Sequence, residues 1–161
     1  AYMTDTPAMT ITEQAYIRKP YQPYIRLQGN SGTRVTNYGT TTTYTNFQVA
    51  QSRGITWTSG TGVVTVPITG QYLITYSFYL WMDNIGHSVS HSVVLKHNST
   101  SRQESIMEIP NHSGTGSYLY DNTLSNSLIL TMSTGDTISW QCYADIYGGL
   151  VHTNASVYLL G

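Results

Sequence analysis

The 161-residue sequence predicts an all-β protein, an antiparallel β-sandwich of about ten strands. Runs rich in β-branched and aromatic residues alternate between apolar and polar side chains, as half-buried strands do. Turn residues such as Gly, Pro, Asn and Asp separate these runs roughly every 8 to 12 residues. In addition, no stretch of about ten residues carries the apolar period of an amphipathic helix.

The longest strand-like run extends from Tyr72 to Met82 and divides into two faces. One face is almost entirely apolar and contains Tyr72, Ile74, Tyr76, Phe78 and Leu80. The opposite face mixes Thr and Ser with larger side chains, in the order Leu73, Thr75, Ser77, Tyr79 and Trp81. A face that is only half polar suggests partial cover by another sheet or another subunit.

The other elements follow from the same alternation and from the turns between them. Residues 1–23 contain three of the five prolines and show no sustained period, so we expect an extended N-terminal arm followed by a sandwich domain at residues 24–161. Gly-rich or Asn-rich turns are expected at 29–32, 59–62, 83–86 and 98–100. The expected strands of the domain are 24–27, 40–49, 55–57, 63–66, 72–82, 89–95, 105–109, 118–120, 124–132, 137–144 and 154–160.

Composition limits the classes of function. Charged residues make up 9% of the chain and the formal net charge is −1, so we expect no nucleic-acid partner, which would need a basic patch. No apolar run reaches the roughly 18 residues of a membrane-spanning helix, and we expect no membrane insertion. The single cysteine, Cys142, leaves no internal disulfide and alternates with Ile138, Trp140 and Ala144, which predicts a small side chain in the core.

Two spaced motifs resemble a known family. The spacing Gly62-x-Val64-x-Val66-Pro67-x-x-Gly70-x-Tyr72 resembles the pattern shared by tumour necrosis factors and the globular heads of complement's first-component q subunit. A later segment, Leu130-x-Met132-x-x-Gly135-Asp136-x-Ile138, is similar to that family's Leu-x-x-Gly-Asp-x-Val turn, with Met in place of Leu. The last strand is similar in position, but Ala155 and Val157 replace the family's Phe and Gly.

The resemblance implies a jelly roll over residues 24–161 and a homotrimer. Large aromatic side chains are the expected anchors of such an interface. Our candidates for the trimer interface are Tyr72, Tyr76, Phe78 and Tyr158.

Within that superfamily, a low-charge chain rich in Thr, Ser and Tyr with an extended arm is most similar to the trimeric knobs on virus and bacteriophage particles. This similarity implies a non-enzymatic virion surface protein, either a capsid decoration or a fibre-tip knob, that binds other virion proteins or a host-surface receptor or glycan. The alternatives are a secreted complement-head-like or cytokine-like ligand and a carbohydrate-binding module. The expected location is therefore the virion surface or, more generally, the extracellular space.

Motifs for catalysis are missing from the sequence, which has neither a Gly-x-Ser-x-Gly elbow nor a Gly-x-x-x-x-Gly-Lys phosphate loop. We expect no catalytic residues and no cofactor, and we expect Asp136 to cap backbone amides in its Gly-Asp turn. Three histidines, His87, His91 and His97, share one face of a strand-like segment and are weak candidates for a metal site. Hydrogen-bonded or solvent-facing histidines are the favoured interpretation, because no Cys or paired acid completes a ligand set.

Tyrosine is frequent, with 14 residues, and several of these rings are expected to reach interfaces. Aromatic rings stack on the faces of sugar rings, while amides, hydroxyls and imidazoles bind the polar edges. The loop residues of these types that we expect to contact a surface ligand are Tyr38, Trp57, Trp81, His112, Tyr118, Tyr147 and His152.

Overall fold

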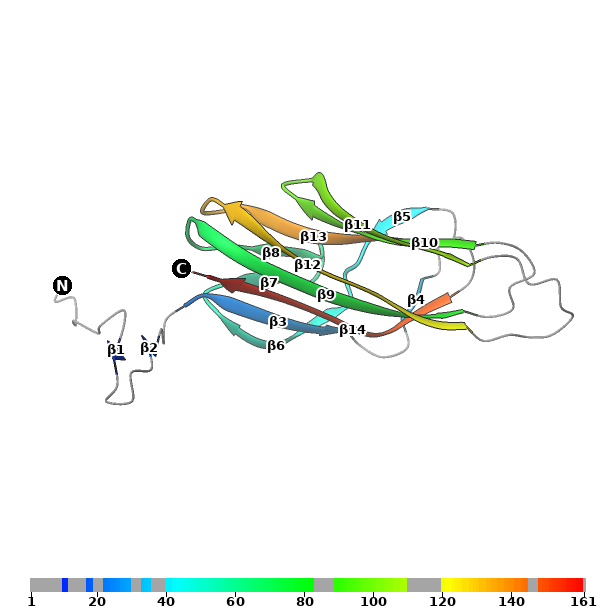
Figure 1. Cartoon of the computed structure of the whole chain (residues 1–161), viewed down its shortest axis with the longest axis horizontal. Coiled ribbons are helices and arrows are strands. Elements are labelled where there is room, and N and C mark those ends of the chain that lie inside the picture. The colour runs from blue at the N-terminus through cyan, green and yellow to red at the C-terminus, as the bar shows by residue number, and fades with distance from the viewer. Residues whose placement is uncertain are drawn as a thin grey trace, which may run out of the picture.

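The computed structural model of the chain describes residues 10–11, 17–18, 22–29, 33–35, 40–82, 89–109, 120–144 and 148–160. Within these residues the chain forms two six-stranded antiparallel sheets and a separate pair of two-residue strands, β1 (Thr10–Ile11) and β2 (Ile17–Arg18). The predicted all-β sandwich is confirmed (Figure 1). No helix in the described part of the chain is long and apolar enough to cross a membrane.

We call the first sheet the β9 sheet, after its longest central strand. Its strand order is β12 (Tyr120–Met132), β9 (Gly70–Met82), β14 (Gly148–Leu159), β3 (Tyr24–Gly29) and β6 (Phe47–Arg53), with β4 (Thr33–Val35) also paired to β14. The second is the β13 sheet. Its order is β11 (Thr100–Ile109), β10 (Val89–His97), β13 (Thr137–Ala144), β8 (Val63–Thr65) and β7 (Thr56–Thr58), with β5 (Thr41–Thr43) also paired to β13.

The connections give the sandwich its jelly-roll character. From β4 to β14 the chain passes from one sheet to the other at every connection except β7 to β8 and β10 to β11. Repeated crossing of this kind places strands that are distant in sequence next to each other, as in double-sheet jelly rolls. The N-terminal β3, for example, pairs with the C-terminal β14 over Tyr24 to Gln28 (Figure 1).

The predicted alternation in β9 is confirmed. Tyr72, Ile74, Tyr76 and Phe78 are at most 3% exposed and point between the sheets. The β13 sheet contributes buried residues to the same core, including Trp140 and the predicted core cysteine, Cys142. Burial in this apolar environment raises the pKa of the Cys142 thiol, which keeps it protonated and unreactive.

Phe47, at the start of β6, connects the aromatic side chains of the core. Its ring makes edge-to-face contacts with four other rings at centroid distances of 4.7 to 5.8 Å, namely Tyr44, Trp57, Phe78 and Trp140. Edge-to-face pairs of this kind add stability beyond the buried area alone. Because Phe78 belongs to the β9 sheet and Trp140 to the β13 sheet, Phe47 joins the two layers.

Gly62, the first residue of the first family-like motif, is required by the backbone geometry. Its φ of 68° lies in the left-handed region, and a Cβ built on it would lie 2.6 Å from the backbone oxygen of Tyr44. No side chain fits that space without moving the backbone. The motif therefore marks a close approach between the segment before β8 and the segment after β5.

Candidate functional site

The outer face of the β9 sheet points away from the β13 sheet, which does not cover it. Residues that are directly opposite each other in an antiparallel sheet point to the same side. The register therefore defines rows of side chains that cross the five main strands from β12 to β6. Three such rows lie on the outer face.

The first row is apolar over four strands. It consists of Ile129, Leu73, Tyr158, Tyr24 and, at the edge strand β6, Arg53. Ile129 is 58% exposed, and Tyr24 and Tyr158 stack with ring centroids 6.0 Å apart and an interplanar angle of 16°. Leu160, 42% exposed, follows directly after β14. We call Ile129, Leu73, Tyr158 and Tyr24 the apolar row.

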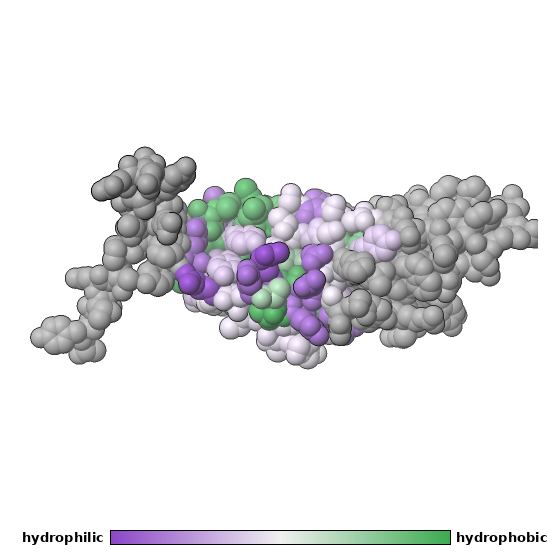
Figure 2. All heavy atoms as spheres, turned by 90° about the horizontal axis from the view of Figure 1, so that it is seen from below, coloured by the Kyte–Doolittle hydropathy of each residue, from purple (hydrophilic) through white to green (hydrophobic). Residues whose placement is uncertain are grey.

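The next two rows are polar. In order from β12 to β6, they read Ser127, Thr75, Ser156, Arg26, Gln51 and then Ser125, Ser77, Asn154, Gln28, Gln48. The apolar row thus lies towards the end of the domain where β3 begins, and the polar rows follow it. On the side of the molecule that Figure 2 shows, hydrophobic residues gather near one end of the coloured part, with hydrophilic residues beside and beyond them.

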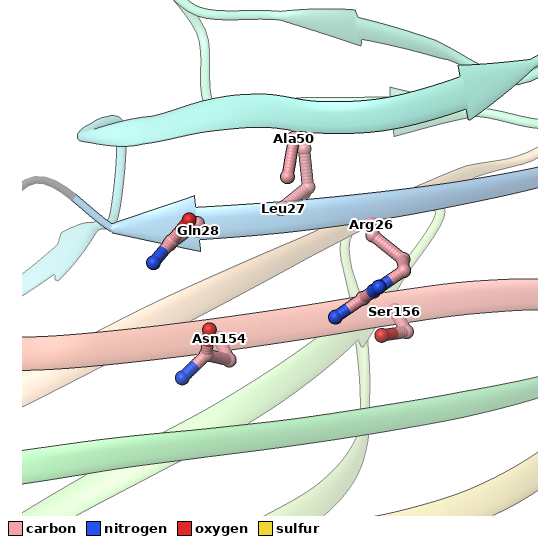
Figure 3. Close-up of a pocket in the computed structure, with 6 residues that line it drawn as sticks. All are labelled: Arg26, Leu27, Gln28, Ala50, Asn154 and Ser156. Carbon is pink, nitrogen blue, oxygen red and sulfur yellow. The ribbon is translucent and has the colours of Figure 1, made fainter.

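A hollow of about 170 Å³ lies in the polar rows, over β3, β6 and β14. It is lined by Arg26, Leu27, Gln28, Ala50, Asn154 and Ser156 (Figure 3). The register between β3 and β6 shifts between Arg26 and Leu27, so Ala50 is an extra residue on β6 and forms a β-bulge. The short side chain of Ala50 leaves space beside Arg26 that a longer one would fill.

The interface candidates fall on two different faces. Tyr72, Tyr76 and Phe78 are 0%, 3% and 0% exposed within a single chain, which places their side chains in its core and not on its surface. They belong to the core because they share the β9 face that points at the β13 sheet. Tyr158 lies on the outer face and stays a predicted interface residue.

The two candidate histidines in the described part of the chain do not form a shared metal site. His91 and His97 do point the same way, into the sandwich, and are 0% and 8% exposed. Six residues of strand separate them by about 20 Å, too far for one metal ion to bind both. His87 lies outside the described residues. Across the described part of the chain, no group of three or more His, Cys, Asp and Glu side chains could hold a metal.

His97 instead takes part in a hydrogen-bonded network around Asp136. The Asp136 carboxylate accepts hydrogen bonds from the Asn98 side chain at 2.7 Å and from the Ser133 amide at 2.8 Å, and it lies 2.9 Å from His97 Nε2. These bonds, led by that from Asn98, lower the pKa of Asp136 to about 2. The predicted capping role of Asp136 is confirmed, and the network connects the β10–β11 hairpin to the β12–β13 turn.

Most of the predicted ligand residues are outside the described part of the chain. Tyr38, His112, Tyr118 and Tyr147 lie in segments that the structure does not describe, and the side chains of Trp81 in β9 and His152 in β14 are likewise outside it. Trp57 is described and half-buried. Its indole N–H donates to the Phe47 carbonyl oxygen at 3.1 Å, and its ring packs on Phe47, so much of it is used for structure.

No protein-family model and no curated protein matches this chain. Among solved structures, the chain is similar to the Eiger TNF of S. frugiperda, with a TM-score of 0.63 and 18% sequence identity. That similarity covers 86% of this chain and 94% of the other. The chain therefore has a TNF-like jelly-roll fold, as the two motifs implied, whereas the similarity to viral knobs finds no support in this comparison.

Sequence reasoning did not identify the apolar row or the hollow. One signal for the row was present, because the alternation in β9 had already indicated a half-polar second face that includes Leu73. The interface candidates were nevertheless chosen for aromatic size, and three of the four came from the other face. The hollow had no local signal, since its residues come from three strands that are far apart in the sequence.

Proposed function

We propose that this chain is a non-enzymatic, TNF-like binding domain that assembles as a homotrimer and engages a receptor outside the cell. The observation that carries this proposal is the apolar row on the uncovered face of a TNF-like sandwich. The proposal concerns the part of the chain around β9, β12 and β14, where the row is most apolar.

The apolar row is not needed to complete the core of one chain. The core between the sheets is closed by residues such as Ile74 and Phe78, both 0% exposed, whereas Ile129 is 58% exposed on the opposite side. Contiguous apolar surface of this kind marks interaction sites on soluble proteins. A second and third copy of the same chain are suitable partners, because the apolar row carries no charge. Arg53 alone is charged at its β6 end, so copies would meet with little like-charge repulsion.

The likeness to an animal cytokine supports the ligand-like alternative from the sequence better than the virion-surface interpretation. A secreted, cytokine-like or complement-head-like ligand is therefore the proposed class, with an extracellular location and a receptor as partner. The fold alone does not identify that receptor, because one fold serves many binding functions.

The test is the solution mass of the full chain by light scattering over a range of concentrations. We expect a stable species of about three times 17.9 kDa. A species that stays at the mass of one chain at every concentration contradicts the proposal, because the apolar row would then be stable in water without a partner copy.

A further inference from the structure

The hollow over β3, β6 and β14 combines groups that are suited to one class of ligand. Its rim carries a guanidinium from Arg26, carboxamides from Gln28 and Asn154, and a hydroxyl from Ser156. In Figure 3 the Arg26 side chain extends from β3 towards Ser156 on β14, while Gln28 and Asn154 lie beside each other on the same two strands. The register confirms these as two directly opposed pairs, Arg26 with Ser156 and Gln28 with Asn154.

Arg26 supplies the charge of the hollow. Its guanidinium makes no hydrogen bond and no ion pair with the described residues. A guanidinium presents a planar fork of N–H donors that matches the two oxygens of a carboxylate. A carboxylate is therefore the group that Arg26 is best suited to bind.

The other groups extend this recognition beyond a single anion. Carboxamides both donate and accept hydrogen bonds, and the Ser156 hydroxyl does the same, which suits a ligand with several hydroxyl groups.

We propose that this hollow binds an acidic sugar residue, with the carboxylate on Arg26 and the hydroxyls on Gln28, Asn154 and Ser156. The volume of about 170 Å³ is well below the roughly 300 Å³ of small drug-binding sites, so the hollow admits one terminal sugar residue. A single residue on an open face binds weakly, with a Kd of about a millimolar. The inference does not depend on the trimer, since every lining residue comes from one chain.

The test is an NMR titration of the uniformly ¹⁵N-labelled full chain at constant ionic strength, in which the amide chemical shifts report binding. The probes are D-glucuronate, D-glucose, which has the same ring without the carboxylate, and acetate, which has the carboxylate without the ring. We expect glucuronate to shift the amides of Arg26, Gln28, Asn154 and Ser156. We expect glucose and acetate each to bind about tenfold more weakly, because each lacks one half of the contacts.

Two arginine variants locate the site. Arg26→Gln should weaken glucuronate binding about tenfold or more, whereas Arg53→Gln, which removes a charge from the same face outside the hollow, should change it about twofold at most. A well-dispersed spectrum of each variant confirms that the chain still folds. The proposal is overturned if glucuronate causes no shifts, if the shifts map away from the hollow, if acetate binds as tightly as glucuronate, or if Arg26→Gln binds like the unaltered chain.

Discussion

Replacing Ile129 by serine tests the proposed trimer without disturbing the fold. Ile129 is 58% exposed on the edge strand β12, so its substitution should cost a single chain only about 0.5 kcal/mol. Full burial of an isoleucine side chain contributes about 1.5 to 3 kcal/mol. The 58% that is still exposed therefore represents about 1 to 2 kcal/mol per subunit if the trimer covers it.

Three subunits bring the expected loss to about 3 to 5 kcal/mol per trimer, which raises the dissociation constant by about two to four orders of magnitude. Light scattering or sedimentation over a dilution series measures this shift directly. Urea unfolding of the dissociated chain, monitored by circular dichroism, measures the cost to the fold.

Val49→Ser is the matched control. Val49 is also β-branched, is 46% exposed and lies on β6, the other edge strand of the β9 sheet, but it is not part of the apolar row. We expect it to leave the trimer intact. If Ile129→Ser dissociates no more readily than the unaltered protein, or if Val49→Ser dissociates equally, then the row is not the interface.

Three further predictions follow from the fold. Gly62→Ala should destabilise the chain by about 2 to 4 kcal/mol in urea unfolding, because the new Cβ overlaps the backbone of Tyr44 and an alanine is strained at a left-handed φ. Gly60→Ala is the control and should be close to neutral, because nothing lies within 4 Å of its Cβ. Equal effects of the two substitutions would refute this reasoning. The lowered pKa of Asp136 implies a contribution to stability that is present above about pH 3.8 and lost as the pH falls through about 2. The thermal midpoint of Asp136→Asn should therefore depend less on pH across this range, and an unchanged pH dependence would contradict the reasoning. Tyr76→Ala should lower the stability of the fold itself by about 3 to 5 kcal/mol, and folded monomers of unaltered stability would instead restore Tyr76 as an interface residue.

The elements of the fold were predictable where the signal is local. The alternation from Tyr72 to Phe78 identified the strand and grouped its apolar side chains on one face, because a strand turns its side chains by half a revolution per residue. The signal for the Gly135-Asp136 turn was equally local. The φ of 86° at Gly135 favours glycine, and the Asp136 carboxylate accepts a hydrogen bond from the amide of Ser133, three residues earlier. Short strands such as β4 and β5 were not predicted separately, because three residues carry too little periodicity.

The candidate site was harder to predict because it depends on which strands pair and at which register. Tyr24 and Tyr158 stack, and Arg26 faces Ser156, only because β3 pairs with β14 at one particular register. A shift of one residue would turn every one of these side chains to the other face of the sheet. The bulge at Ala50 that opens the hollow is likewise set by pairing with β3.

By itself, the sequence determined that the chain is an all-β sandwich, since periodicity and backbone sterics act over a few residues. Its two motifs added a resemblance to the TNF-like jelly rolls. Only the tertiary structure decided which face of each strand is core and which is surface. That choice depends on which strands pair and which layer covers them. It places Tyr76 in the core and leaves Ile129 and Arg26 exposed, because the β13 sheet covers one face of β9 and its neighbours and does not cover the other.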